Sequence, residues 1–332
     1  MGIERSYRRP VSGTFLFLAL IFWAVLCPEG SEGDQPPPHP IPDMTPRWGA
    51  SAVRLSDGKI VVTGGFTGQD VGVTEIYDPA RHAWTRASSD PHPRTSACAV
   101  ALSDGRVLVT GGYDGSYLGT TEFYDPLHDR WTRGNKDPVP RAGGAGVVLP
   151  DGNVFVTGGF NDTGYLASSE LFHPSTGTWS AVRPDPVPRW ASSAVALRDG
   201  TVLVVGGYDG RTLGTVERYD PGTDSWKTKA SDPVLRWGAS AVRLPSGDVL
   251  VVDGYGEDYL SAAEIYSVKN NAWKQAVPDP IPREKAVALL LSDGRVLVEG
   301  GLNTGGFLSV GELYDPGRNR WTALSSKNRP AP

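Results

Sequence analysis

Short runs of apolar and β-branched residues recur along the chain, and turn residues separate them. The first runs after residue 46 are ASAVRL (residues 50–55), KIVVTG (59–64), VTEIY (73–77) and AWTRA (83–87). Asp-Gly between the first two runs and Asp-Pro between the last two are signals for tight turns. The pattern therefore predicts four short antiparallel strands that form one meander.

The same four strands are predicted six times, because marker residues recur at a fixed spacing. An arginine stands 17 residues before the first position of a glycine pair, and successive arginines are 47 or 48 residues apart. An aromatic residue follows the pair, and a tryptophan stands seven residues beyond it. The arginines are Arg47, Arg94, Arg141, Arg189, Arg236 and Arg283. The aromatic pairs are Tyr77 and Trp84, Tyr124 and Trp131, Phe172 and Trp179, Tyr219 and Trp226, Tyr266 and Trp273, and Tyr314 and Trp321.

This repeat resembles the kelch repeat, in which a glycine pair closes a strand and Tyr and Trp follow. The resemblance implies an all-β fold, a six-bladed kelch-type β-propeller with four antiparallel strands per blade around a central channel. The six repeats are residues 47–93, 94–140, 141–188, 189–235, 236–282 and 283–324. Every copy runs from its first strand to its fourth, so we expect the ring to close by packing, without a swapped strand. The glycine pair is then a backbone corner and not a phosphate site.

The two ends of the chain differ from the repeats. Residues 1–33 contain three arginines followed by an apolar run, residues 15–27, which is shorter than the roughly 20 residues of a membrane helix. They predict a signal peptide or an uncleaved anchor, and lipidation at Cys27 is a third possibility. Residues 34–46 are rich in proline and predict a stiff tether, and residues 325–332 form a C-terminal tail. We therefore expect an extracytoplasmic protein, secreted or tethered to the cell surface.

Composition argues against several classes of function. The formal net charge of -5 disfavours nucleic acid as a partner. A membrane is expected as a partner only through the possible N-terminal anchor. None of the five histidines pairs by spacing with another metal ligand, so we expect no metal, no cofactor and no catalytic residue. Galactose oxidase shares the kelch-type propeller, but its copper site uses two histidines and a cysteine-linked tyrosine, and no such set is evident here.

Candidate binding residues are expected on the face that carries the loops between the second and third strands. These loops differ in every copy, whereas the turns of the other face are short and alike. Three copies carry a tryptophan after the arginine, Asp253 replaces a corner glycine, and Glu299 stands where other copies have Thr or Val. The expected ligand-binding residues are Arg47, Trp48, Tyr113, Tyr117, Arg189, Trp190, Arg236, Trp237, Asp253, Tyr255, Tyr259, Arg283 and Glu299.

Two interpretations of the recurrent arginines stay open. The six side chains would form an anion-binding ring at the channel mouth, or each would pair with the repeated aspartate and glutamate of its copy and fix the joint between blades. Strict recurrence favours the joint. Asp253 and Glu299 near Tyr255, Tyr259 and Trp237 would hold a polar ligand such as a sugar, or only make local salt bridges.

The expected function is a binding module whose partner is a protein, an acidic peptide or a glycan. Acidic peptides are included among the expected partners because related kelch propellers often bind them with arginines of the inner strands. The alternatives are an extracytoplasmic enzyme of sialidase or oxidase type, a lectin-like domain, and a purely structural domain of a larger assembly. Fold alone does not choose among them.

Overall fold

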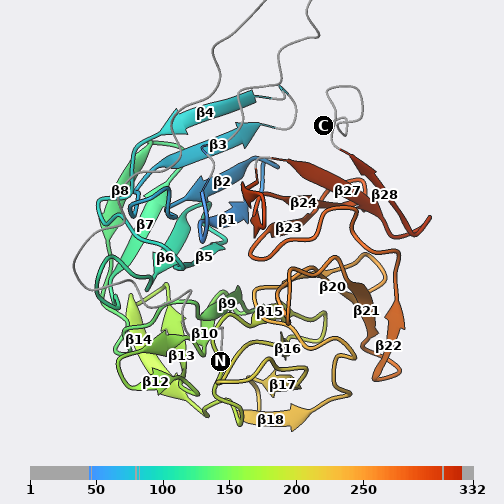
Figure 1. Cartoon of the computed structure of the whole chain (residues 1–332). Coiled ribbons are helices and arrows are strands. Elements are labelled where there is room, and N and C mark those ends of the chain that lie inside the picture. Colours follow the sequence, from blue (N-terminus) through green and yellow to red (C-terminus); the bar gives the residue numbers. More distant parts are fainter. Residues whose placement is uncertain (1–44, 46, 79–80, 82, 309, 324–332) are drawn as a thin grey trace, which may run out of the picture. The chain divides into compact units, whose positions relative to one another are not determined.

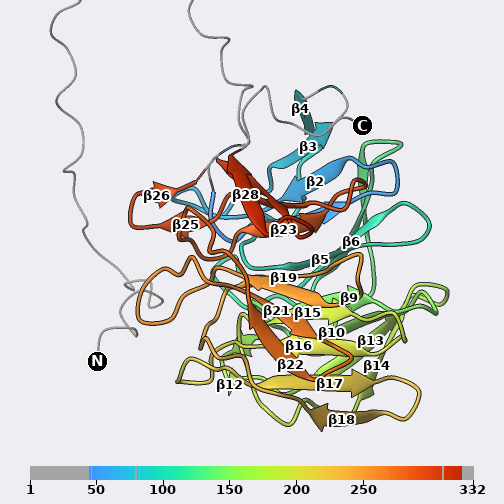
Figure 2. The same ribbon diagram turned by 90° about the vertical axis from the view of Figure 1, so that its right-hand side faces the viewer.

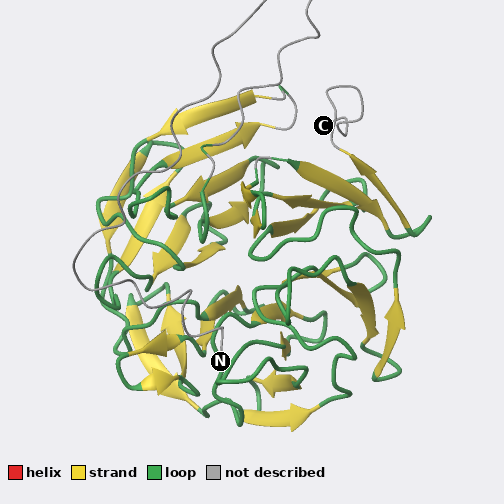
Figure 3. Cartoon of the chain, viewed as in Figure 1, coloured by secondary structure: helices red, strands yellow, loops and turns green. Residues whose placement is uncertain are grey.

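The computed structural model describes residues 45–323, except residues 46, 79–80, 82 and 309 (Figure 1). The predicted signal peptide, nearly all of the proline-rich tether and the C-terminal tail lie outside the described residues. The described residues form strands, turns and loops without a helix (Figure 3). In this part of the chain there is accordingly no helix long and apolar enough to cross a membrane.

Six four-stranded antiparallel sheets follow one another, each built from the strands of one repeat. In chain order the sheets are β1(Ser51–Arg54), β2(Ile60–Thr63), β3(Thr74–Asp78) and β4(Ala83–Ala87); β5(Cys98–Ala101), β6(Val107–Thr110), β7(Thr121–Asp125) and β8(Arg130–Arg133); β9(Ala145–Val148), β10(Val154–Thr157), β13(Ser169–His173) and β14(Thr178–Val182); β15(Ser193–Ala196), β16(Val202–Val205), β17(Val216–Asp220) and β18(Ser225–Thr228); β19(Ser240–Arg243), β20(Val249–Val252), β21(Ala263–Ser267) and β22(Ala272–Gln275); β23(Val287–Leu290), β24(Val296–Glu299), β27(Gly311–Asp315) and β28(Arg320–Ala323).

Two loops between second and third strands form short hairpins of their own. They are β11(Phe160–Asn161) with β12(Gly164–Tyr165) in blade three, and β25(Leu302–Asn303) with β26(Gly306–Phe307) in blade six.

The six sheets are the blades of a closed ring. The innermost strand of each blade contacts that of the next, and β23 of the last blade contacts β1 of the first. Figure 1 shows the blades arranged around a common centre, with the chain passing from blue to red around it. The predicted six-bladed propeller is confirmed, and in the described residues every four-stranded sheet consists of the strands of a single repeat, with no strand exchanged between the first and last blades.

Each seam between blades contains its own hydrophobic core. In blades one to five the second strand is buried along its whole length, because both faces of each sheet pack against a neighbouring blade. In blade six only Glu299, at the end of β24, is partly exposed. The closing seam follows the same rule, with residues of blade one packed on residues of blade six. Its cluster contains Ile60, Val62, Tyr77, Leu291, Leu297 and Leu313. Burial of each such side chain stabilises the ring by about 1.5–3 kcal/mol.

The repeated tyrosine and tryptophan fill these seams, as the sequence predicts. They stand opposite each other on the third and fourth strands, and in blade two the ring centroids of Tyr124 and Trp131 are 5.1 Å apart. The indole N–H of Trp131 then donates a hydrogen bond to the Ser88 carbonyl of blade one at 2.8 Å. The tryptophans of blades three to six make the equivalent bond to the preceding blade.

The glycine pair is a backbone corner in direct contact with the next blade. Gly64 and Gly65 have φ angles of 71° and 107°, which favour glycine. A Cβ atom on Gly64 would lie 2.7 Å from the Arg94 carbonyl oxygen, which accepts a hydrogen bond from the Gly65 N–H at 2.7 Å. The repeated Gly-Gly therefore joins one blade to the arginine of the next.

Candidate binding face around the channel mouth

The variable loops and the arginine joints lie on one face of the propeller, which we call the loop face. In every blade the residue after the joint arginine forms a β-bridge with the first residue of the loop, as Trp48 does with Phe66 and Trp237 does with Tyr255. Figure 2 shows β12, β25 and β26 on the same side of the disc. This arrangement agrees with the one expected from the course of the strands.

The joint arginines are buried within the ring and already bonded. Arg236 donates to Asp232 from Nε at 2.9 Å and from Nη2 at 3.1 Å, and its Nη2 also contacts Glu264. Its Nη1 donates to the carbonyls of Asp253 and Ala262. The four arginines expected to bind ligand are at most 2% exposed: Arg47, Arg189, Arg236 and Arg283. Their positions support the joint interpretation, because the guanidinium groups lie beneath the loop face.

Aromatic side chains form one continuous row across blades two to five of the loop face. The centroids of neighbouring rings are 5.0 to 6.5 Å apart. The members of this aromatic row are, in order, Tyr113, Tyr117, Phe160, Tyr165, Tyr208, Trp237, Tyr255 and Tyr259. All except Trp237 are partly exposed. The row unites tyrosines expected from the sequence with Phe160, Tyr165 and Tyr208, which were not expected.

Six residues form a ring around the axis at the channel mouth. Each is the second residue after a joint arginine, and backbone hydrogen bonds of 2.7 to 3.0 Å connect them from blade one to blade six. All six have positive φ angles, between 52° and 66°. The members of this axial ring are Gly49, Ser96, Gly143, Ala191, Gly238 and Lys285. Lys285 is thus the single long side chain in a ring of otherwise small residues.

The ammonium group of Lys285 lies between tryptophan rings. Its Nζ atom is 4.1 Å from the centroid of Trp48 and 4.5 Å from that of Trp190, and Trp190 lies 5.0 Å from Trp237. We call these three tryptophans the tryptophan cage. Trp190 belongs to blade four and Lys285 to blade six, so their contact spans the channel mouth. Cation–π contacts of this kind contribute about 0.5–2 kcal/mol each.

Glu284 is the acidic neighbour of this ammonium group. Its side chain is buried, and burial raises the pKa of Glu284 to about 7, against the opposing effects of the Lys285 charge and the Trp48 N–H. Burial lowers the pKa of Lys285 to about 8, against the opposing charge of Glu284.

Asp253 and Glu299, expected as two carboxylates of one site, lie at different seams of blade six. Asp253 is buried and lies 3.8 Å from Arg283, at the seam with blade five. Burial and the neighbouring charge of Asp279 raise the pKa of Asp253 well above its usual value. Glu299 lines an apolar crevice with Trp84 at the seam with blade one. The expected two-carboxylate site is therefore not formed, because one carboxylate is held in a joint and the other in the closing seam.

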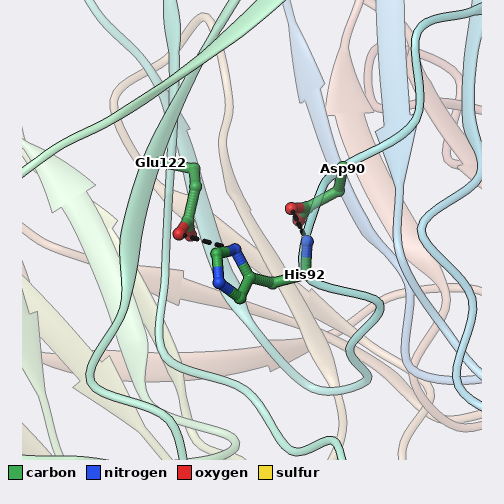
Figure 4. Close-up of side chains that lie close together, drawn as sticks. All are labelled: Asp90, His92 and Glu122. Atoms are coloured by element: carbon green, nitrogen blue, oxygen red, sulfur yellow. Dashed lines mark hydrogen bonds and ion pairs between the residues drawn. The ribbon is translucent and has the colours of Figure 1, made fainter.

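Within the described residues, one group of three side chains has the composition of a metal site: Asp90, His92 and Glu122 (Figure 4). The Nδ1 atom of His92 lies 2.9 Å from Oε1 of Glu122. The guanidinium of Arg94 already pairs with both carboxylates, at 3.0 Å from Asp90 and in close contact with Glu122. Because this cation neutralises the two acids, the group is better suited to fixing the joint of blade two than to holding a divalent ion.

The charged residues of the variable loops are mainly acidic. The six loops contain six acidic residues and one basic residue, Arg211. The acidic residues are Asp70, Asp114, Asp162, Asp209, Glu257 and Asp258. A cationic group approaching the channel mouth is therefore attracted by the loops that surround it.

The sequence also contains a signal for Lys285, which the spacing of the arginines, glycine pairs and aromatic residues does not reveal. Aligned on the joint arginine, the six copies have Gly, Ser, Gly, Ala, Gly and Lys at the second following position. One long charged residue among small ones marks a position where the chain places a side chain on the axis. The signal for Tyr208 is similar, because an aromatic residue follows the glycine pair in five of the six copies.

Comparison with known proteins agrees with this architecture. The kelch motif matches residues 47–91, 94–138, 141–186 and 189–233, which make up more than half of the chain. The chain belongs to the kelch-repeat family. Kelch propellers commonly serve as protein-interaction modules, and the fold of this kelch protein supports that general role.

A solved structure named "Structure of YjhT" is similar to this kelch protein. Its TM-score is 0.74 at 18% sequence identity, over 86% of this chain and 99% of that chain. At this identity the similarity shows the shared fold. A search of curated proteins found no match.

Proposed function

We propose that this kelch protein is an extracytoplasmic binding module, secreted or held at the cell surface, that binds a partner protein with its loop face. The aromatic row carries the proposal, since it places partly exposed rings in unbroken contact across four blades. Aromatic rings contribute large apolar contact area at low entropic cost, and they are frequent at the centres of protein interfaces. The leader-like pattern of residues 1–33 supports the extracytoplasmic location.

The opposite face offers much less for recognition. Its first turns are short and their charges are paired locally, as in Lys59 with Asp57 at 2.8 Å and Arg106 with Asp104 at 2.6 Å. Such a surface is nearly the same in each blade. Binding through variable loops on a rigid scaffold is the more common arrangement.

The charge of the loop face favours a cationic partner segment over an acidic one. The joint arginines are bonded within the blades, and six of the seven charged residues in the variable loops are acidic. We therefore propose a partner that presents basic and apolar side chains to the aromatic row.

A glycan is the second candidate, and the pairing of carboxylates with tyrosines favours it. Asp162 lies near enough to Tyr117 for its charge to raise the pKa of that phenol, after the larger effects of burial and of Tyr113. A carboxylate beside an aromatic ring can accept hydrogen bonds from sugar hydroxyls while the ring stacks on the sugar.

We propose binding and not catalysis as the role of this face. The cluster of Asp90, His92 and Glu122 is paired with Arg94, and the three tryptophans and Lys285 form a recognition surface without a paired nucleophile and base.

The experiment compares the two faces in the full chain. Pull-down from the native extracytoplasmic fraction and a glycan array are carried out with the unaltered protein, with Tyr117→Ala combined with Tyr208→Ala, and with Asp104→Lys on the opposite face. We expect the double variant to lose the bound partner and Asp104→Lys to keep it. Loss of the bound partner with Asp104→Lys, together with its retention by the double variant, would contradict the proposal. Glycans bound on the array without a protein partner in the pull-down would support the second candidate.

A further inference from the structure

We propose that the tryptophan cage is a binding site for an organic ammonium group of the partner, a lysine side chain in the first instance. Lys285 occupies the cage in the free protein and leaves it when the partner's ammonium group enters. This inference rests on the proposed function in one respect, because the partner reaches the cage across the same loop face.

The cage has the chemistry that selects an ammonium ion. Two indole rings approach the Lys285 ammonium at 4.1 and 4.5 Å, from blades on different sides of the channel mouth. The third ring, Trp237, packs against Trp190 and connects the cage to the aromatic row. Faces of tryptophan attract a cation by their electron density, and an anion or a neutral sugar gains no such attraction there.

The carboxyl group of Glu284 borders the cage and places negative charge beside it when ionised. Its side chain is 4% exposed, and the nearby N–H of Trp48 favours its ionised form. A Cβ atom placed on Gly238 would lie 3.2 Å from Cγ of Lys285 and 3.5 Å from Oε2 of Glu284, so the carboxylate borders the same space as the lysine stem. An ammonium group that replaces Lys285 would meet the same carboxylate.

The fold itself does not require a lysine at this position. Five blades form the same turn of the axial ring with Gly, Ser or Ala, at φ angles that a long side chain adopts at a cost of about 1–2 kcal/mol. Lys285 adopts this conformation at φ 52°. A strained residue whose side chain contacts a recognition surface is typical of a functional position.

The cage reaches the surface of the loop face on one side. Trp48 and Lys285 are partly exposed, whereas Trp190 and Trp237 form the buried floor. The flexible four-carbon stem of a lysine can swing out without movement of the backbone. Exchange of one ammonium for another conserves the charge in the cage, so the cage contributes selectivity for a cation and the aromatic row contributes contact area.

The test uses tetramethylammonium chloride as the probe and the full chain as the receptor. Quenching of tryptophan fluorescence is measured against sodium chloride at equal ionic strength, for the unaltered protein and for Lys285→Gly, which has the residue found in three other blades. Lys274→Ala, an exposed lysine on β22, is the matched control. We expect Lys285→Gly to bind tetramethylammonium at least about tenfold more tightly than the unaltered protein, a difference of about 1.4 kcal/mol.

A second variant makes the result specific to the cage. Trp48→Leu in the Lys285→Gly background should weaken binding of the probe by at least about tenfold, because one cation–π contact is lost. Equal affinity of Lys285→Gly and the unaltered protein, or no effect of Trp48→Leu, would overturn the inference. The probe binds without a partner, so this titration does not depend on the outcome of the two-face experiment. Failure of the proposed function and failure of the cage proposal are therefore distinguishable.

Discussion

The ammonium group of Lys285 lies 4.1 Å from the centre of the Trp48 ring, and the two residues belong to the last and the first blade. Their contact crosses the seam where the propeller closes. The same lysine also reaches Trp190 of blade four, so one side chain connects three blades at the channel mouth. The loop face and the closure of the ring are therefore coupled at this point.

Lys285→Gly is expected to lower the free energy of unfolding by less than about 3 kcal/mol. Loss of the two cation–π contacts costs about 1–4 kcal/mol in total, and relief of the positive φ returns about 1–2 kcal/mol. Urea denaturation measures the difference. A loss above about 3 kcal/mol would mean that Lys285 is a structural closure element and not an exchangeable occupant.

Arg236→Met is expected to destabilise the propeller by about 3–5 kcal/mol, because it leaves the buried carboxylates of Asp232 and Glu264 without their cation. Arg130→Met is the control. The Arg130 side chain is 64% exposed and lies 3.5 Å from Asp125, so its loss should cost less than about 0.5 kcal/mol. Similar losses for both variants in thermal or urea unfolding would contradict the assignment of the joints.

Asp253→Gly is expected to stabilise the protein, by an amount that grows with pH. The pKa of Asp253 is raised in the folded state, so above pH 3.8 the folded state binds more protons than the unfolded state, and stability falls as pH rises toward the folded-state pKa. Glycine removes this loss and restores the residue found at this corner in the other five copies. Melting temperatures at about pH 5 and about pH 8 give the comparison. A smaller stability gain at the higher pH would contradict this prediction, because it would mean that the pKa of Asp253 is not raised in the folded state.

Deletion of residues 283–332 is expected to abolish cooperative folding. Blade six covers the apolar surfaces of both neighbours, including Ile60 and Val62 of blade one and Leu250 and Val252 of blade five. A five-blade product would expose two seams. Circular dichroism and calorimetry are the measurements, and a soluble product with a single sharp transition would be evidence against the closed ring.

The sequence was sufficient for the fold because the fold depends on features that every copy repeats. Gly64 and Gly65 mark a corner, Tyr77 and Trp84 mark a seam, and the arginines mark the joints. Every blade needs the same corner, seam and joint, so these residues recur at a fixed spacing in the sequence. The same logic favoured the joint interpretation of the arginines, since a contact needed in every blade is a structural one. Four of them were nevertheless expected to bind ligand as well, because spacing does not show that their guanidinium groups are buried.

The binding face was less predictable because its contacts join different blades. Contact of Tyr117 with Phe160 depends on side-chain directions across a blade boundary, which spacing within one copy does not give. Asp253 and Glu299 both depart from the repeat pattern, yet they lie at opposite seams of blade six. The role of Lys285 depends on Trp190, two blades away.

Photo-crosslinking from single positions tests the loop face as the binding surface most directly. A photoreactive phenylalanine analogue replaces Tyr208 in the aromatic row or Asp104 on the opposite face, and the full chain is irradiated in the native extracytoplasmic fraction. We expect a covalent partner adduct from position 208 and none from position 104. Adducts from position 104 alone would contradict this expectation.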